Sequence, residues 1–286
     1  MGEKFTFRQV DVFTSVPFKG NPVAVVHDAD GLAPDEMQAI ARWTNLSETT
    51  FVCAPTDPRA DYLLRIFTPA MELPFAGHPT VGSAHAALRG GLRPKMPGTL
   101  VQQCGKGLVP VRVEGERLLF ELPRPAVRDI HADELAEVAG ALGIQTREVT
   151  SSALIDVGAV WLTLQLADAD VVRGLRPDQA RVAAITPRGA AGVTVFGVEG
   201  AGGEALFEVR SFAPAHGINE DPVCGSGNGC VAVLARRERL CAEDSYVARQ
   251  GRSVGRDGRV EVRFGEEGTI LVGGHAVTCV EGTLEI

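Results

Sequence analysis

The chain has 286 residues, of which 45% are hydrophobic and 22% charged, a composition typical of a folded globular protein with roughly two domains. Its formal net charge of −8 argues against nucleic acid or an anionic membrane surface as partner, because both bind basic patches. No apolar run approaches the ~20 residues of a membrane span, and charged residues follow the first methionine at once. We therefore expect a cytoplasmic protein without a signal peptide.

Six cysteines are spread along the chain, at positions 53, 104, 224, 230, 241 and 279. None forms a Cys-x-x-Cys pair, and the six histidines show no metal-ligand spacing with acids or cysteines. In a long, cytosolic chain, reduced and mostly buried thiols are expected. The sequence thus predicts neither disulfides nor a metal ion.

The first half of the chain predicts a mixture of strands and two helices. Alternating or β-branched runs favour strands at residues 5–13, 23–26, 49–53, 63–67, 108–113 and 118–122. A proline and two acidic residues at its start predict a helix over residues 34–43. A second helix, over residues 79–88, is rich in small side chains.

A Pro-Arg-Pro stretch at residues 123–125 is the best linker candidate, which predicts domains over residues 1–123 and 124–286. In the second half, helices are expected at residues 133–143 and 225–239. Strands are expected at residues 154–157, 161–166, 193–198, 206–211, 260–264, 269–272 and 277–280. The last of these strands is a candidate to pack on the first domain.

The two halves resemble each other in sequence. An Arg-x-Phe-x-Pro stretch ending at Pro69 or Pro214 is followed in each half by a Gly-rich segment and then by a helix of small residues. Phe67 and Phe212 are 145 residues apart, whereas Ala76 and Cys224, in the Gly-rich segments, are 148 apart. One loop insertion of three residues explains this drift, so the pattern favours a duplicated domain; coincidence between Gly-rich loops is the alternative.

Both Gly-rich segments are expected to open a helix, at residues 77–80 and 225–228. Free backbone N–H groups at a helix start bind carboxylate or phosphate without positive side chains, so Gly77, Gly225 and Gly227 are candidate substrate-binding residues. The alternative is a helix start that merely packs tightly. Neither segment matches a dinucleotide or P-loop pattern, which argues against NAD and ATP.

Four side chains near these segments are candidates for proton chemistry. His78 lies in the first Gly-rich segment and Asp221 just before the second; a structural histidine and an N-terminal cap are the alternatives. Cys224 stands at a helix start, where a thiol ionises more readily, unless it is packed and inert. Glu48 follows a helix in a turn, and only burial would let it both take up and return a proton.

Four segments in order resemble the phenazine-biosynthesis PhzF-like family, which has the diaminopimelate-epimerase fold. They are VDVFT with FKGNPVAV (residues 10–14 and 18–25), NLSETTF (45–51), FAGHPTVG (75–82) and DPVCGSG (221–227). The resemblance implies two similar α/β domains, each with a curved, mostly antiparallel sheet wrapped around a central helix. It also implies a site in the cleft between the domains and a homodimer.

The same resemblance implies the residue roles. Glu48 corresponds to the catalytic acid/base, His78 and Asp221 support it, and Ser226 joins the substrate-binding residues. The implied activity is a cofactor-independent isomerisation of a small anionic carboxylic acid, in which Glu48 moves a proton between two carbons.

Cys224 departs from the family pattern, because the phenazine isomerases carry threonine at that position. Its segment resembles the second catalytic-thiol segment of epimerases and proline-racemase-like enzymes, although Ala76 replaces their first thiol. Two alternatives therefore remain beside the isomerase: a two-base amino-acid or hydroxy-acid epimerase using Cys224 with Glu48, and a non-catalytic small-acid binding protein.

Overall fold

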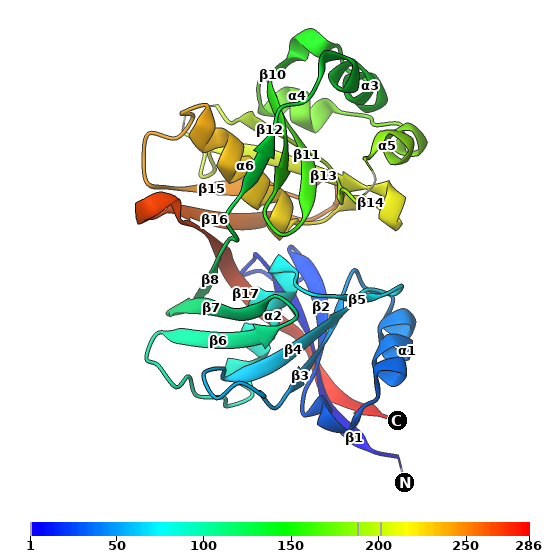
Figure 1. Cartoon of the computed structure of the whole chain (residues 1–286), viewed down its shortest axis with the longest axis vertical. Helices are drawn as coiled ribbons and strands as arrows, with labels where there is room; N and C mark the ends of the chain where they lie inside the picture. The colour runs from blue at the N-terminus through cyan, green and yellow to red at the C-terminus, as the bar shows by residue number, and fades with distance from the viewer. Residues whose placement is uncertain (1, 188, 201) are drawn as a thin grey trace. The chain divides into compact units, whose positions relative to one another are not determined.

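The computed structural model describes residues 2–187, 189–200 and 202–286. The chain divides into two compact units, of which unit 1 is Met1–Glu121 with Gly273–Ile286 and unit 2 is Leu122–Val272. Each unit is a mixed α/β structure dominated by its sheet (Figure 1), so the predicted fold class is confirmed. The division into domains at residues 123 and 124 stays a prediction.

Unit 1 contains two α-helices and most of the N-terminal strands. Its helices are α1 (Pro34–Thr44) and α2 (Gly77–Arg89). Its strands are β1 (Lys4–Val12), β2 (Asn21–Val26), β3 (Thr49–Cys53), β4 (Tyr62–Phe67), β5 (Glu72–Leu73), β6 (Thr99–Cys104), β7 (Gly107–Glu114) and β8 (Arg117–Glu121). The last strand of the chain, β17 (Ile270–Glu285), contributes its residues from Gly273 onward to this unit.

The described residues of unit 2 form four α-helices. They are α3 (Ala132–Leu142), α4 (Ala169–Gly174), α5 (Gln179–Ile185) and α6 (Gly225–Arg237). Its strands are β9 (Ala126–Arg128), β10 (Val149–Asp156), β11 (Val160–Leu166), β12 (Gly192–Val198), β13 (Phe207–Ala213), β14 (Ile218–Asp221), β15 (Ser245–Gln250) and β16 (Gly258–Phe264). Within the described part of the chain, no helix has the length and apolar character needed to cross a membrane.

The two units repeat one strand order. In unit 1, β3 pairs in parallel with β2 and antiparallel with β4, and β4 continues antiparallel to β5 and parallel to β6. In unit 2, β12, β11, β13, β14 and β15 take the same places with the same directions. The pseudo-repeat expected from the sequence is therefore present in the pairing of the strands.

A repeated side-chain group supports this correspondence. In each unit an arginine on the second strand before the central helix binds a glutamate of the strand that follows and stacks over a phenylalanine ring. The groups are Arg65, Phe67 and Glu72 in unit 1 and Arg210, Phe212 and Glu220 in unit 2. The paired nitrogen–oxygen distances are 2.8 and 2.7 Å in unit 1 and 3.0 and 2.8 Å in unit 2.

This group also locates the insertion that separates the repeats. The arginines and phenylalanines are 145 residues apart, but the glutamates are 148 apart. The three additional residues of unit 2 therefore lie between β13 and β14, where the short helix η3 (Pro214–His216) stands. An insertion in a hairpin loop leaves the strands and the following helix in register.

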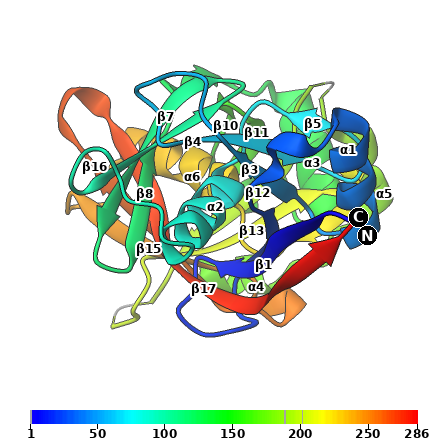
Figure 2. The ribbon, with the colours of Figure 1, turned by 90° about the horizontal axis from the view of Figure 1, so that it is seen from below.

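A helix of small residues is enclosed by the sheet of each unit. Most residues of α2 are buried, and the helix contacts β1, β2, β3, β4, β6 and β8. Figure 2 shows α2 from below, with β1, β3 and β8 around it. Most residues of α6 are also buried, and this helix contacts β10, β11, β12 and β16. The predicted central helices are confirmed.

Glycine allows each central helix to approach its sheet. A Cβ atom on Gly82 of α2 would overlap the side chains of Val12 and Val23. On Gly227 of α6 it would lie 2.7 Å from the hydroxyl oxygens of both Ser211 and Thr194. Such distances are below van der Waals contact, so a larger residue would push the helix away from the strands.

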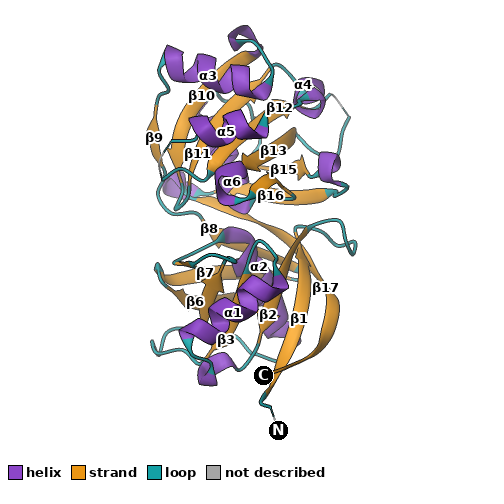
Figure 3. Cartoon of the chain, turned by 90° about the vertical axis from the view of Figure 1, so that its right-hand side faces the viewer, coloured by secondary structure: helices purple, strands orange, loops and turns teal. Residues whose placement is uncertain are grey.

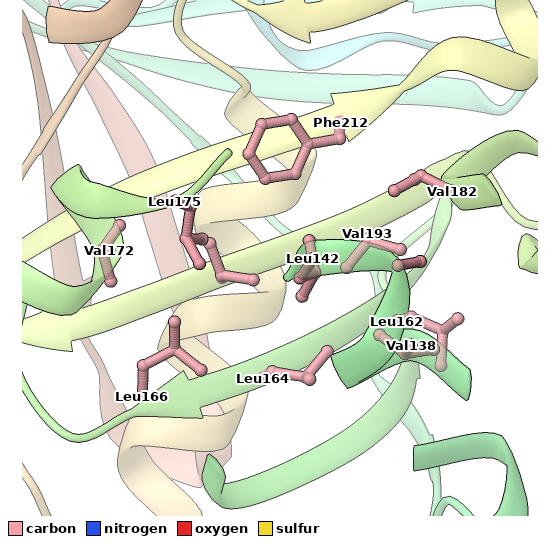
Figure 4. Close-up of a cluster of buried hydrophobic side chains, with 12 residues drawn as sticks. Val138, Leu142, Leu162, Leu164, Leu166, Val172, Leu175, Val182, Val193 and Phe212 are labelled. Carbon is pink, nitrogen blue, oxygen red and sulfur yellow. The ribbon is translucent and has the colours of Figure 1, made fainter. Parts of the chain in front are cut away.

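The opposite faces of the sheets are covered by the remaining helices (Figure 3). In unit 2, α3, α4 and α5 enclose leucines of β11, valines of β12 and Phe212, which Figure 4 shows pointing into one cluster. In unit 1, Met37 and Ala41 of α1 pack on Phe5, Phe51 and other buried residues of the sheet. Because strand side chains alternate between faces, each sheet has one face for its central helix and one for this outer layer.

Some predicted elements need correction. The strands expected at residues 269–272 and 277–280 are parts of one strand, β17, which runs through the glycines at 273 and 274. Gly273 lies within the strand where the backbone of Leu118 comes close. A Cβ atom at Gly273 would collide with the Leu118 carbonyl oxygen, so the close approach requires glycine there. The prediction missed the strands β5, β6, β9, β14 and β15. It also missed the short helices α4 and α5, each of which is capped by an aspartate.

Replacing the glycine at either close approach is expected to destabilise the protein. Gly82→Ala and Gly227→Ala should each lower the free energy of unfolding by about 1–3 kcal/mol, because overpacking outweighs the helix propensity gained. Gly174→Ala is the control, since nothing lies within 4 Å of its Cβ position. Denaturant unfolding measures the difference; equal stability of all three variants would contradict the packing argument.

Candidate functional site

Glu48 lies in the turn between α1 and β3, as the sequence predicts. The helix ends at Asn45, whose left-handed backbone conformation (φ 53°) turns the chain. The hydroxyl oxygens of Thr44 and Thr49 lie 2.6 Å apart, which joins the helix end to the strand start. On the strand, Thr50 donates to the Ala24 carbonyl. The segment that carries Glu48 is therefore fixed at both ends.

The structure brings Glu48 and His78 together. Glu48 Oε2 lies 3.2 Å from His78 Nε2, and the exposed fractions of the two side chains are 13% and 6%. His78 occupies the first turn of α2, which is joined to β3 by a contact of 2.8 Å between the hydroxyl oxygens of Thr50 and Ser83. A carboxylate and an imidazole that are both largely removed from water thus lie in contact.

His78 is the neutral member of this pair. Burial lowers the pKa of His78 to about 3, so the ring carries no charge at neutral pH. The amide nitrogen of Asn21, at the start of β2, lies 3.4 Å from His78 Nδ1 and can only donate. The proton of the neutral ring is therefore assigned to Nε2; this atom lies 3.2 Å from Glu48 Oε2, although the pair does not meet the geometry of a hydrogen bond.

A second polar cluster lies at the start of α6, in unit 2. The Cys224 thiol hydrogen-bonds to the Asp221 carboxylate, which also accepts from the Val223 N–H at 3.0 Å. Burial raises the pKa of Asp221 to about 6, although these two hydrogen bonds oppose the shift. The aspartate is not the cap of α6, as one interpretation of the sequence had it; Cys224 is, with its sulfur accepting from the Gly227 N–H at 3.2 Å.

Of the two interpretations of Cys224 that the sequence leaves open, burial favours the packed thiol over the thiolate. Burial raises the pKa of the Cys224 thiol well above its usual range, and the nearby Asp221 carboxylate raises it further. Hydrogen bonds from Gly227 and Ser226 favour ionisation but are the smaller effects. A helix start lowers the pKa of a thiol only where the thiolate is not also desolvated beside another negative charge.

Ser226 lies in the first turn of α6 and is held by a residue that the sequence analysis did not select. The Trp161 indole N–H, on β11, donates to Ser226 Oγ at 3.0 Å. Ser226 and His78 are 148 residues apart, so they occupy the same place in the two repeats. Asn21 binds His78 in the same way from β2, which stands in unit 1 where β11 stands in unit 2.

Each predicted anion-binding segment does begin a helix. Gly77 is the first residue of α2 and Gly225 the first residue of α6. N–H groups in a first helical turn have no partner within their own helix, apart from any bound by a cap. Cys224 takes the Gly227 N–H as such a cap, which leaves the amides of Gly225 and Ser226 as the donors of this turn. Substrate binding by these glycines stays a prediction.

No group of three histidine, cysteine, aspartate or glutamate side chains that could hold a metal ion occurs among residues 2–187, 189–200 and 202–286.

Comparison with known proteins identifies the family. The sequence profile of the family described as phenazine biosynthesis-like protein (PhzC-PhzF) matches residues 10–282. The chain belongs to this PhzF family. Its crystallised members include a PhzF family protein of Bacillus anthracis, which is similar to this chain with a TM-score of 0.87, 25% identity and coverage of 99% of this chain and 100% of that one.

Two curated relatives are similar in sequence to this PhzF family chain over almost its whole length. Antisense-enhancing sequence 1 of Schizosaccharomyces pombe is 42% identical, over 97% of both chains. Trans-2,3-dihydro-3-hydroxyanthranilate isomerase of Pseudomonas fluorescens is 34% identical, over 96% of this chain and 97% of its own. The family and its named isomerases identify the protein as an enzyme of the isomerase class.

Two buried histidines and one partly buried histidine of unit 1 predict sensitivity to acid. Burial lowers the pKa of His78 to about 3 and those of His27 and His85 to about 4, each from 6.5. Between pH 6.5 and 4 the unfolded chain therefore binds protons that the folded unit does not. Stability is complete above pH 6.5 and falls below it, by up to about 1.4 kcal/mol per pH unit for each ring.

This prediction can be checked with His85→Gln, which removes one of the three rings. Urea unfolding at about pH 7.5 and about pH 5 should show a smaller loss of stability in the variant than in the wild type. His131→Gln, at an exposed histidine, is the matched control and should behave as the wild type. An unchanged acid sensitivity in His85→Gln would contradict the assignment of a partly buried neutral ring.

Proposed function

We propose that this isomerase transfers a proton between two carbons of a small carboxylic acid with Glu48 as its single acid/base. The observation that carries the proposal is the contact of 3.2 Å between Glu48 and His78, both largely shielded from water. A general base must be ionised when it accepts a proton and must return that proton later, which shielding from bulk water favours.

In this mechanism the Glu48 carboxylate removes a proton from an activated carbon and, once protonated, delivers it to another carbon. The neutral His78 ring places an N–H dipole rather than a full positive charge beside the carboxylate. A nearby dipole stabilises the ionised carboxylate less than an imidazolium would, so the carboxylate can also be protonated. Asn21 favours the tautomer with its proton on Nε2, an atom that lies 3.2 Å from Glu48 Oε2 without meeting hydrogen-bond geometry in this structure.

The proposed substrate carries a carboxylate, which local hydrogen-bond donors must bind against the net charge of −8 of the chain. The first-turn amides at Gly77 and Gly225 are donors suited to an anion or to developing enolate charge. The isomerase of Pseudomonas fluorescens is named for a substrate that is itself a carboxylic acid. Asp221 and Ser226 are the proposed hydrogen-bonding partners of other polar groups on the substrate.

The two-base epimerase is the weaker alternative for this chain. It needs Cys224 to act as a thiolate, but burial and the neighbouring Asp221 carboxylate both raise the pKa of that thiol. The sulfur is also engaged as the cap of α6. The named isomerases of the family favour an enzyme over a non-catalytic binding protein.

Glu48→Gln is expected to abolish turnover while the protein remains folded. A neutral amide cannot accept the proton, so the rate should fall by roughly 10²- to 10⁴-fold. The assay incubates trans-2,3-dihydro-3-hydroxyanthranilate and a panel of small carboxylic acids in D₂O and measures deuterium incorporation by mass spectrometry. Glu116→Gln, at an exposed carboxylate, is the control. Turnover by Glu48→Gln at the wild-type rate would refute the proposed role.

Cys224→Ser is expected to retain most of the activity. A serine hydroxyl can accept the Gly227 N–H as the sulfur does, and serine is a favoured N-cap residue. The isomerase needs no thiol, so kcat should stay within about threefold of the wild type, whereas a two-base epimerase would lose solvent exchange at the substrate α-carbon. Loss of that exchange in Cys224→Ser would favour the epimerase.

A further inference from the structure

Gln250, the last residue of β15, binds the segment that precedes and opens α6. Its Oε1 accepts from the Cys224 N–H at 3.1 Å and from Asn228 Nδ2 at 2.8 Å. Its Nε2 donates to the Asp221 carbonyl at 3.0 Å. The side chain is fully buried, so these bonds form out of contact with water.

The bonds of Gln250 hold the backbone on both sides of the turn. Asn228 Nδ2 also donates to the Cys224 carbonyl at 2.8 Å, so both backbone polar groups of Cys224 are fixed. Gly251, directly after Gln250, has φ 104°, and a Cβ atom there would lie 2.6 Å from the Pro222 carbonyl. The end of β15 therefore packs closely against the Asp221–Cys224 turn.

Gln102 on β6 has the corresponding place in unit 1. It is also fully buried; it accepts from the Tyr62 hydroxyl at 3.0 Å and donates through Nε2 to Thr80 Oγ1 at 3.0 Å. Thr80 in turn donates to the carbonyl of Ala76 at 2.8 Å. Ala76 occupies the N-cap position of α2. His78 lies between the two residues held by this chain of hydrogen bonds.

The two glutamines are equivalent in the repeat. Gln102 and Gln250 are 148 residues apart, as are Ala76 and Cys224 at the helix caps and Thr80 and Asn228 in the first turns. The contacts differ in detail, but in both units a buried carboxamide on the strand after the central helix binds the first turn of that helix. A neutral amide suits this place because it donates and accepts without placing a charge in the core.

We propose that Gln102 and Gln250 are positioning residues for the active site. Gln102 sets the first turn of α2 and with it the orientation of His78 toward Glu48. Gln250 sets the turn that presents Asp221, Cys224 and Ser226. The effect on activity rests on the proposed function, whereas the ordering of the two helix starts rests on the contacts themselves.

The test uses Gln102→Met and Gln250→Met, which keep the length of the side chain but remove its hydrogen bonds. In Gln102→Met, kcat should fall about 10- to 100-fold with a smaller change in KM, because the proton-transfer pair is displaced. In Gln250→Met, KM should rise about tenfold or more with a smaller change in kcat, because substrate contacts are displaced. Unchanged kcat and KM in both variants would overturn the proposal.

A readout that needs no substrate separates this proposal from the proposed function. Amide hydrogen exchange at Cys224 should accelerate selectively in Gln250→Met, since its N–H loses the carboxamide acceptor. Val195→Ala, in the cluster on the other face of the sheet, is the control for general destabilisation and should show no selective change. Unaltered protection of Cys224 in Gln250→Met would overturn the positioning role, even if Glu48→Gln proved active.

Gln250→Glu provides a conservative variant in case the methionine variants do not fold. When protonated, its carboxyl group can still accept from Cys224 and Asn228 and donate to the Asp221 carbonyl; when ionised, it faces that carbonyl with a negative charge. Its KM relative to the wild type should therefore recover as pH falls. A KM ratio that does not change with pH would contradict the hydrogen-bond role.

Discussion

The close approach of a small-residue helix to its own sheet determines most of what each unit can do. Gly82 and Gly227 leave no room for a Cβ atom, so α2 and α6 lie against the strands and most of their residues are buried. Burial of the helix carries its first turn out of bulk water as well. The polar groups there then interact in surroundings where a neutral hydrogen bond is favoured over an isolated charge.

The consequences differ between the two units because their polar residues differ. In unit 1 a carboxylate meets an imidazole that burial keeps neutral, which is a suitable arrangement for accepting and returning a proton. In unit 2 a carboxylate meets a thiol, and desolvation keeps that thiol protonated. The same structural position thus holds His78 in one repeat and Ser226 in the other, each bound by a donor from the equivalent strand.

Because the two units repeat one strand order, equivalent residues of the two units can be found from their constant spacing in the sequence. The Arg–Phe–Glu groups, the helix caps and the two buried glutamines keep their spacing through the repeat, apart from three residues added between β13 and β14. These groups join the sheet to the helix starts by directional hydrogen bonds. Side chains that contact ligands can then differ between repeats without loss of the frame.

Much of this protein was determined by the sequence alone. Turn residues, caps and alternating strands located most elements, and four ordered segments indicated the family together with Glu48, His78, Asp221 and Ser226. These signals depend on residues that are close together in the chain, so they can be recognised without the tertiary structure. The position of Glu48 in a helix-to-strand turn was predictable for the same reason.

The tertiary structure alone determined which side chains are buried and which distant residues form hydrogen bonds. The thiol of Cys224 stands at a helix start, yet its burial beside Asp221 reverses the ionisation expected of that position. Trp161, Asn21, Gln102 and Gln250 act through partners on other strands or helices, and Gly273 continues a strand because of the neighbouring backbone. Burial and long-range hydrogen bonds depend on which surfaces meet, and only the folded chain brings those surfaces together.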